Sequence, residues 1–460
     1  MKLLALILSL SFLVLIHEGG HLFFAKLFKT RVEKFYLFFY PWFSILRAKK
    51  YDKKWHFSFF STSSPKEFEE HPDHTEWGIG WLPFGGYCSI SGMIDETNTD
   101  GSKMASEPQP WEYRSKKAWQ RLLIIAGGVL VNFVGALVIY SAIMFTWGTD
   151  TLPLKNVPYG YDYNQTALKY GFKNGDYVLS IDGKQMNEMK DVVSSLLLDG
   201  GTKVKVLRGN DTVMVTMPED FGKEMLGAGE KQFAVPRFPF VIGQFADNAV
   251  GEKAGLRVGD SLVAINGQQT LSFSEFLATI TRYAGTKIVV SYYRDNKLDS
   301  LAINLKEDGK IGAYCKDYTS EMKVVHNSYG VFESIPKGVS YGWQTLVSYV
   351  KQFKLVFSKE GASQLGGFGT ITSLFPESWD WLRFWTMTAF LSIILAFMNI
   401  LPIPALDGGH VMFTLWEIIT GRKPSDKFLE RAQMVGMILL LLLLVYANGN
   451  DLVRWLSGKL

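Results

Sequence analysis

Four stretches of the chain are apolar and long enough to cross a lipid bilayer as helices, which takes roughly 20 residues each. Inside a bilayer no water satisfies the backbone N–H and C=O groups, so a spanning segment of this length must be helical. The pattern therefore predicts a polytopic α-helical membrane protein with four transmembrane helices. The apolar stretches are Leu3–Phe28, Leu122–Trp147, Phe384–Leu406 and Val435–Leu456, and with flanking residues we assign the helices to 1–28, 119–148, 384–410 and 432–457.

Lysine and arginine residues predict which side of the membrane each loop faces, because cytoplasmic loops carry an excess of both. Basic clusters follow the first span, precede the second, and separate the third from the fourth. Asp150, Glu377 and Asp380 instead mark the ends of the long region between spans two and three. We therefore expect loops 29–118 and 419–431 to be cytoplasmic, and the long region and both termini to be extracytoplasmic.

The bulk composition excludes several other classes of protein. A formal net charge of +4 over 460 residues is too small to indicate a nucleic-acid partner. Cys88 and Cys315 are the only cysteines, which excludes a disulfide framework and a thiolate zinc site. The lipid bilayer is the partner that the composition indicates.

The extracytoplasmic region contains a weak internal repeat. Residues Gly171–Gly183 match Gly255–Gly267, since each copy has a Gly-Asp turn, a short apolar strand and an Asp-Gly or Asn-Gly hairpin turn. A helix-like segment and alternating strands follow each copy. This order resembles that of PDZ domains, so we expect two extracytoplasmic PDZ-like α+β domains at 151–232 and 233–310. The alternative is two unrelated small β modules.

Two regions next to the spans are expected to touch the membrane. In the linker 311–383, residues Ser334–Phe357 have the spacing of an amphipathic helix lying along the outer membrane surface. In the first cytoplasmic loop, the aromatic stretch Val32–Leu46 predicts a strand–turn–strand hairpin at the membrane face, with a simple interfacial aromatic belt as the alternative. The polar residues Lys53–Glu76 are expected to form a solvated loop. The glycines of Gly80–Tyr87 would let the backbone approach a neighbour closely.

The first apolar stretch contains three ionisable residues, His17, Glu18 and His21, in the run His-Glu-Gly-Gly-His. Burying such groups in hydrocarbon is costly, and they usually mark a functional site. Two histidines four residues apart lie on one face of a helix, which suits a zinc ion. A glutamate beside them suits hydrolysis, because it can take a proton from water that the metal has made acidic. We infer that His17 and His21 are metal ligands and that Glu18 is the catalytic base.

A catalytic zinc normally has three protein ligands, so a third must come from another segment. Asp407 is the best candidate, because it closes the third apolar stretch, where an unpaired carboxylate would be expensive. By helical rise His17 lies about 21 Å into the first span, at the same end at which Asp407 completes the third. Asn399 is placed to donate a hydrogen bond to the developing oxyanion or to hold the substrate backbone. His410 is expected to start a helix or to support the ligands rather than to bind the metal.

These residues resemble the motifs of intramembrane site-2 proteases, and in particular of the bacterial regulator-of-sigma-E proteases. The matching motifs are His17–His21, Gly128-x-x-x-Asn132 and Asn399–Gly409, and the resemblance covers essentially the whole chain. It implies an intramembrane metalloprotease with one zinc ion per chain, held by the two histidines and the aspartate. It also implies that the glutamate is the catalytic residue and that Asn399 holds substrate.

The resemblance also implies a biological setting. Proteases of this type perform regulated intramembrane proteolysis in the bacterial cytoplasmic (inner) membrane. Their substrates are single-span proteins trimmed by an earlier cut, including anti-sigma factors and remnant signal peptides. The segment matching Val32–Leu46 would be a membrane-reentrant element that adds an edge strand to an unwound substrate helix. Two departures concern gating and substrate choice: Gly366–Ile371 replaces a Gly-Pro-Ile-like run, and the insert Lys53–Glu76 is longer than expected.

Some alternatives stay open on the sequence alone. Gly128 and Asn132 could be helix-packing residues or substrate contacts. The chain could also be a catalytically silent membrane scaffold that captures C-termini through its PDZ-like domains, although such a scaffold need not keep Glu18 and three metal ligands. A secreted soluble zincin with a signal peptide is disfavoured by the three later apolar stretches.

Overall fold

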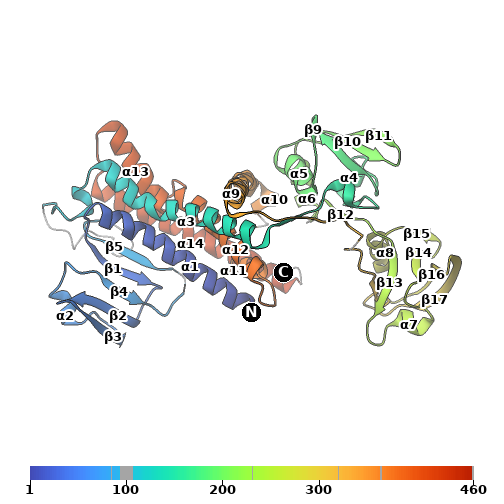
Figure 1. Cartoon of the computed structure of the whole chain (residues 1–460), viewed down its shortest axis with the longest axis horizontal. Helices are drawn as coiled ribbons and strands as arrows, with labels where there is room; N and C mark the ends of the chain where they lie inside the picture. Colours follow the sequence, from blue (N-terminus) through green and yellow to red (C-terminus); the bar gives the residue numbers. More distant parts are fainter. Residues whose placement is uncertain (84, 94–106, 231, 320, 363–364, 458–460) are drawn as a thin grey trace. The chain divides into compact units, whose positions relative to one another are not determined.

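The computed structural model describes residues 1–83, 85–93, 107–230, 232–319, 321–362 and 365–457. These residues fall into two compact units (Figure 1). We call them the helix unit, with residues 1–148, 328–356 and 362–460, and the insert unit, with residues 149–327 and 357–361. The longer segment of the insert unit, 149–327, is therefore an insertion between two helices of the helix unit.

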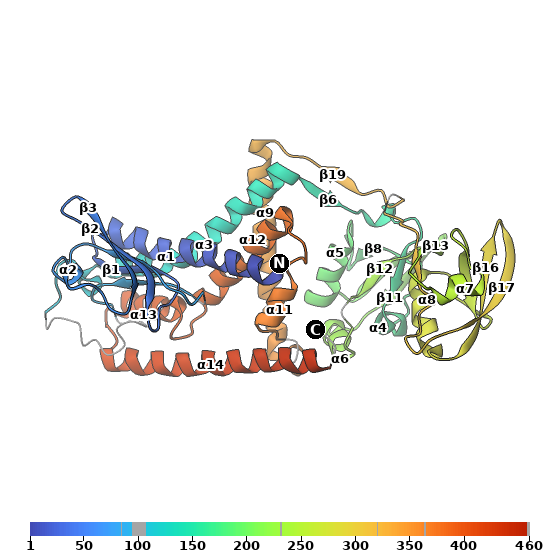
Figure 2. The same ribbon diagram turned by 90° about the horizontal axis from the view of Figure 1, so that it is seen from below.

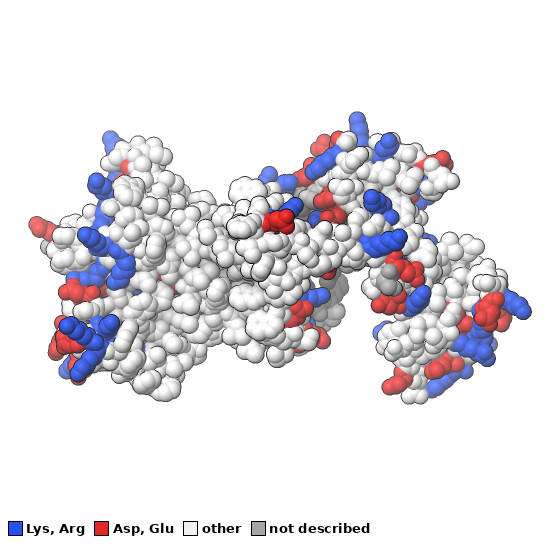
Figure 3. Space-filling view, viewed as in Figure 1, with Lys and Arg blue, Asp and Glu red and all other residues white. Residues whose placement is uncertain are grey.

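Within the described residues, four helices of the helix unit are long and apolar enough to span a membrane. Their exposed flank carries almost no charge, whereas lysines, arginines and acids gather at the end of the unit that holds its β-sheet (Figure 3). The predicted number and order of membrane helices is confirmed at the level of length and composition. The helices are α1 (Lys2–Leu27), α3 (Ala118–Trp147), α12 (Trp381–Ile400) and α14 (Asp426–Leu456).

The third span ends earlier than predicted. α12 ends at Ile400, and a separate helix, α13 (Asp407–Thr420), follows after a turn. The two prolines of the Asn399–Gly409 run lie in that turn, and a proline ring cannot continue a helix because it has no N–H and clashes with the preceding turn. The single helix predicted over 384–410 is therefore wrong at its end, and Asp407 is the first residue of a new helix.

The predicted amphipathic helix is present as α9 (Val331–Phe353), which packs against α3 and α12. Gly338 permits the close approach to α3, because it lies directly against the backbone of Ser141. Near the end of α9, the ring of Tyr349 meets that of Phe397 in α12 edge-on, with centroids 5.5 Å apart. α9 runs steeply across the direction of α1 and α14 (Figure 2). A helix lying along a membrane surface would have this orientation, and that placement stays a prediction.

Residues 32–90 of the helix unit form a five-stranded sheet with the strand order β3-β2-β4-β1-β5. The prediction that Val32–Leu46 pairs with itself as a hairpin is wrong, because β4 lies between β1 and β2 and pairs with both. The solvated loop expected over 53–76 is also wrong, since this segment contains β3 and a short helix. The elements are β1 (Val32–Leu37), β2 (Ser44–Tyr51), β3 (Lys54–Ser61), α2 (Lys66–Glu69), β4 (Glu76–Ile79) and β5 (Tyr87–Ile90).

A buried ionic network explains the central position of β4. Arg47 on β2 donates to Glu76 on β4 at 3.0 Å, and both side chains are almost completely buried. Tyr36 on β1 also donates a hydrogen bond to Glu76, and Ser64 donates to the second carboxylate oxygen at 2.8 Å. Gly78 of β4 leaves room for the ring of Tyr36. A direct β1–β2 hairpin would leave a buried guanidinium without its counter-charge, which is strongly unfavourable.

The glycine-rich run 80–87 approaches its neighbours closely, as predicted, although Phe84 lies outside the described residues. A Cβ on Gly86 would come 2.5 Å from the carbonyl oxygen of Tyr36 and 2.9 Å from a methyl group of Val14 in α1. The missing side chain therefore lets the sheet lie against the middle of the first span.

The insert unit contains two β subdomains that follow one another along the chain. The first contains β7 (Tyr161–Tyr163), α4 (Gln165–Lys169), β8 (Tyr177–Ile181), β9 (Lys184–Gln185), α5 (Met189–Val193), β10 (Lys203–Arg208), β11 (Asp211–Thr216), α6 (Phe221–Gly227) and β12 (Ala234–Pro236). The second contains β13 (Phe240–Phe245), α7 (Val250–Ala254), β14 (Ser261–Ile265), β15 (Gln268–Gln269), α8 (Phe273–Ile280), β16 (Lys287–Arg294), β17 (Lys297–Asn304) and β18 (Ala313–Cys315). Strands β6 (Thr149–Thr151) and β19 (Val325–Asn327) of the insert unit pair with each other. The chain also contains the short helices α10 (Lys359–Ala362) and α11 (Phe368–Ser373), and α11 lies in the helix unit.

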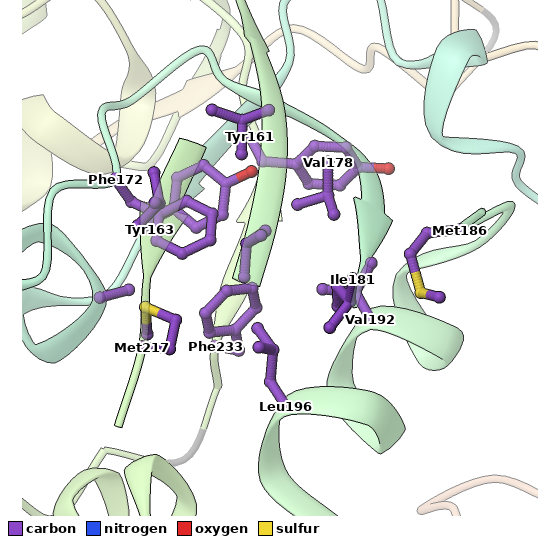
Figure 4. Packing of buried hydrophobic residues seen from close by; sticks show 14 of the residues in the cluster. Tyr161, Tyr163, Phe172, Val178, Ile181, Met186, Val192, Leu196, Met217 and Phe233 are labelled. Carbon is purple, nitrogen blue, oxygen red and sulfur yellow. The ribbon is translucent and has the colours of Figure 1, made fainter. Parts of the chain in front are cut away.

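The structure confirms the internal repeat. Asp176 and Asp260 occupy equivalent turns and are each 1% exposed. Arg208 donates to Asp176 at 2.8 Å, and Arg294 donates to Asp260 at 2.7 Å, in each case from a later strand of the same subdomain. Each subdomain has its own apolar core, and that of the first is built from aromatic and aliphatic side chains (Figure 4).

The assignment of the two subdomains as PDZ-like domains stays a prediction, but the structure moves their boundaries. The first subdomain extends past 232, because β12 returns to pair with β7. The second extends past 310, because β18 pairs with β13. In both subdomains a closing strand, β12 or β18, follows the last strand of the repeated pattern. The sequence repeat therefore did not predict that this strand belongs to the subdomain.

Replacing Glu76 by Gln should loosen the five-stranded sheet, because the Arg47 guanidinium would stay buried without its counter-charge. Removing one partner of a buried pair costs about 3–5 kcal/mol. We expect faster amide hydrogen exchange across 32–90 in the detergent-solubilised protein, measured by mass spectrometry. The double variant Arg47→Met, Glu76→Leu removes both charges and should restore protection. Equal loss of protection in both variants would show that the pair does not set the strand order.

The same network predicts a pH dependence. Burial by itself would raise the pKa of Glu76, but the hydrogen bond from Tyr36 and the positive charge of Lys34 outweigh it and hold that pKa below its usual range. The network's contribution is therefore fully present above the unfolded-state pKa of about 4.3 and is lost as the pH falls below that value. Exchange protection over 32–90, corrected for intrinsic rates, should be constant from about pH 7 to 5 and should fall below about pH 4. A loss that begins near neutral pH would contradict this.

Candidate metal centre

His17 and His21 lie on one face of α1, as their spacing predicts. Their rings meet edge-on with centroids 4.8 Å apart, and their Nε2 atoms are 3.3 Å apart. Both side chains are largely buried. Two imidazole nitrogens that point at each other over this distance repel through their lone pairs, unless a proton or a cation lies between them.

Asp407 reaches the same point from the start of α13. Its Oδ2 atom is 3.2 Å from Nε2 of His17 and 3.5 Å from Nε2 of His21. This oxygen is buried without a hydrogen bond of regular geometry. Among the described residues, these three side chains form a cluster whose ligand atoms lie within 4.8 Å of one another. Two imidazole nitrogens and an unsatisfied carboxylate oxygen are a donor set that zinc accepts, so these residues fit the metal.

A close crossing of α1 and α3 positions the two imidazoles. A Cβ on Gly127 of α3 would come 2.7 Å from the carbonyl oxygen of Gly20 in α1. A Cβ on Gly128 would come 2.5 Å from Nε2 of His21 and 2.7 Å from Nδ1 of His17. Glycine is needed here because the backbone of α3 lies directly against both rings. Gly128 therefore packs against the proposed ligands.

α3 also provides a polar group opposite the Nδ1 atom of each ring. Nδ1 of His21 lies 2.9 Å from the carbonyl oxygen of Ile124. Nδ1 of His17 lies 3.2 Å from the side-chain amide of Asn132, which is fully buried. A carbonyl acceptor such as that of Ile124 fixes the orientation of a metal-binding imidazole and leaves Nε2 for the metal. The Asn132 atom that faces His17 is instead the nitrogen Nδ2, which donates. In this structure the Asn132 amide faces His17.

The other predicted site residues lie beside the cluster. Nδ2 of Asn399 is 3.5 Å from Nε2 of His17. The carboxylate of Glu18 accepts a hydrogen bond from the backbone N–H of Cys88 in β5, and Glu18 is not a member of the ligand cluster. His410 lies in the first turn of α13 and is also outside the cluster. The structure thus brings all the predicted site residues to one place.

Sequence reasoning missed two contributions to this site. The carbonyl group of Ile124 belongs to the backbone, so no residue type in the sequence indicates this contact. The approach of β5 to Glu18 depends on a sheet whose pairing was not predicted. The crossing glycines had a visible signal, since Gly19-Gly20 and Gly127-Gly128 are paired small residues in two spans.

Comparison with known proteins identifies the family. The chain matches the profile of peptidase family M50 over residues 5–63 and 62–443. It belongs to peptidase family M50.

This M50 protein has relatives that match it over nearly their whole length. A regulator of sigma E protease from Haemophilus influenzae is 24% identical over 470 residues, which cover 97% of this chain and 98% of the relative. The regulator of sigma-E protease from Salmonella typhimurium is 25% identical over 481 residues, 98% of each chain. A protein from Neisseria meningitidis, named provisionally as a zinc metalloprotease, is 26% identical over 487 residues, 99% of each chain.

Family membership establishes the type of chemistry. The protein is a metalloendopeptidase of the site-2 protease type, and its cofactor is zinc. With its four candidate spans it is a protein of the inner membrane. The resemblance inferred from the sequence motifs is confirmed.

Replacing Gly128 by Ala should weaken zinc binding, because the new methyl group would push into both imidazole rings. Displaced ligands and supporting groups typically cost 10–100-fold in metal affinity, and we expect a loss of about that size. Zinc affinity of the purified protein can be measured by competition with a fluorescent chelator.

Gly135→Ala is the matched control on the same helix. Its Cβ would come 3.1 Å from the terminal methyl group of Ile16, which can move. This variant should bind zinc like the parent. If the two alanine variants bind zinc equally well, the crossing does not position the imidazoles.

Proposed function

We propose that the protein hydrolyses peptide bonds within the transmembrane segments of single-span proteins. The observation that carries the proposal is the meeting of His17, His21 and Asp407 inside a bundle of candidate membrane helices, with Glu18 between the two histidines in the chain. One zinc ion per chain would be held by these three ligands. The first and third spans are far apart in the sequence. The meeting of their ionisable residues at one point therefore favours a shared metal ion.

Each residue of the site would have a distinct role. When bound, zinc would make water acidic and polarise the scissile carbonyl group. Glu18 would accept the proton of the attacking water and deliver it to the leaving amine. Asn399 would donate a hydrogen bond to the substrate carbonyl as negative charge develops on its oxygen. Gly128 would keep the imidazoles in place by leaving them room.

A substrate helix must unwind before cleavage, because its peptide bonds are shielded by the helical hydrogen bonds. Addition of a strand to a sheet edge stabilises an extended segment. The sheet ends at β5 on the side of α1, and the backbone of Cys88 in that strand contacts Glu18. We therefore assign the pairing role to β5 (Tyr87–Ile90) rather than to Val32–Leu46, whose first strand is enclosed by β4 and β5.

The proposed substrates are proteins that an earlier cut has trimmed, such as anti-sigma factors and remnant signal peptides. The relatives named as regulators of sigma-E protease support the first class. In the proposed topology, loops 29–118 and 419–431 are cytoplasmic, and both termini and the insert unit are extracytoplasmic. The insert unit would then exclude substrates with a bulky outer domain.

Glu18→Gln should abolish cleavage and leave zinc binding unchanged, because the residue moves protons and does not bind the metal. We expect a loss of at least about 10²–10⁴-fold in the rate of cleavage of a reconstituted single-span substrate. Chelation of zinc should abolish cleavage by the parent, and added zinc should restore it. A catalytically silent scaffold predicts no cleavage by the parent and no effect of the substitution.

Trimming should control the rate of cleavage if the insert unit is a size filter. The parent should cut a substrate that lacks its outer domain faster than the same substrate with a folded outer domain attached. The measurement is kcat/KM in proteoliposomes for the two substrates with identical transmembrane segments. Equal values would contradict the filter and leave the metal chemistry untouched.

A further inference from the structure

We propose that Asn132 is a positioning residue that sets the tautomer of His17, with its amide oxygen accepting the Nδ1 proton. This inference rests on the proposed zinc site. The sequence left two roles open for this residue, helix packing and substrate contact. We assign it a different role, the positioning of His17.

The geometry of His17 fixes where its proton must be. Its Nε2 atom faces the other ligand atoms, 3.3 Å from Nε2 of His21 and 3.2 Å from Oδ2 of Asp407. A ring nitrogen that binds a cation must offer its lone pair, and a neutral imidazole carries one proton. That proton must therefore be on Nδ1, which lies 3.2 Å from the Asn132 amide. The group facing it must be an acceptor.

His21 shows the same requirement met in a simpler way. Its Nδ1 atom faces the carbonyl oxygen of Ile124 at 2.9 Å, and a carbonyl group can only accept. Its tautomer is thus fixed by the backbone of α3. Among the described residues, the group that faces Nδ1 of His17, one turn earlier in α1, is the side-chain amide of Asn132.

The side-chain amide of Asn132 can form a hydrogen bond with either tautomer of His17, because one end of the amide donates and the other accepts. Asn132 Nδ2 faces Nδ1 in this structure, while its Oδ1 is buried without a hydrogen-bond partner. In this arrangement Nδ2 donates to Nδ1, which matches a His17 that carries its proton on Nε2 beside Asp407. Half a turn about the Cβ–Cγ bond exchanges the two ends of the amide and places Oδ1 opposite Nδ1. The second arrangement is the one that metal binding through Nε2 requires.

The surroundings of Asn132 do not suit a direct substrate contact. The residue is fully buried, and Ser392 of α12 donates to its backbone oxygen at 2.7 Å. Its side chain therefore lies in the interior formed with α1 and α12. A residue that binds substrate needs a surface that substrate can reach.

The test compares zinc affinity of the full-length purified protein with two variants, by competition with a fluorescent chelator. Asn132→Leu has similar volume but neither donates nor accepts, and it should bind zinc about 10–100-fold more weakly. Asn132→Asp keeps an acceptor in the same position and should bind zinc more tightly than the leucine variant. Parent-like affinity of Asn132→Leu, or weaker binding by Asn132→Asp than by Asn132→Leu, would overturn the inference.

Thr388→Val is the matched control. Thr388 is a fully buried polar residue of α12 whose hydroxyl group donates to that of Ser9 at 2.9 Å, and neither residue is a proposed ligand. Its replacement removes a buried hydrogen bond of the same bundle and should leave zinc affinity unchanged. A loss as large as that of Asn132→Leu would mean that zinc affinity reports only on packing, and the inference would fail.

A second readout covers the case in which the larger variants do not fold. Asn132→Ala adds no bulk, and excess zinc should restore its kcat to near the parent value, because a positioning residue acts through metal occupancy. If kcat stays low at saturating zinc, Asn132 contacts the substrate instead. Failure of the proposed function itself would look different, since the parent would then bind no zinc or cut no substrate.

Discussion

The metal centre depends on how closely two membrane helices can approach. Helices in lipid gain little from hydrophobic burial against each other, so small residues and close backbone packing hold them together. Gly20, Gly127 and Gly128 create such a contact directly beside the imidazoles. The contact brings the carbonyl oxygen of Ile124 to Nδ1 of His21 and the amide of Asn132 to Nδ1 of His17. The third proposed ligand, Asp407, can then complete the cluster because the packing of α3 restricts rotation of the rings.

A break in the third span has an equally direct effect on the site. The prolines after Ile400 end α12 and free a short segment to turn before α13 begins. Asp407 sits at the start of that second helix, where the exposed backbone N–H groups favour a negative charge. The start of the helix therefore stabilises the carboxylate in a largely buried position, where an isolated charge would be costly. The same break leaves Asn399 in the last turn of α12, next to His17.

The sequence predicted most of the site but less of the structure around it. Helical spacing alone places His17 and His21 on one face, and the cost of a charge in hydrocarbon points to Asp407. The four spans follow from length and composition. The β-sheet could not be predicted in the same way, because β4 pairs with β2 through Arg47 and Glu76, which are far apart in the sequence and carry no local pattern. The prolines after Ile400 indicate the helix break. The prediction missed it because the apolar composition continues beyond the prolines.

The paired strands β6 and β19 make the insert unit an independent cassette. The chain leaves the end of α3 and returns to the start of α9 through neighbouring strands, with Asp150 opposite His326 in the ladder. Because the two connections lie side by side, lengthening or exchanging the intervening polypeptide need not move the helices on either side. The insert unit can therefore vary in length and sequence while the helices that hold His17, His21 and Asp407 stay in place.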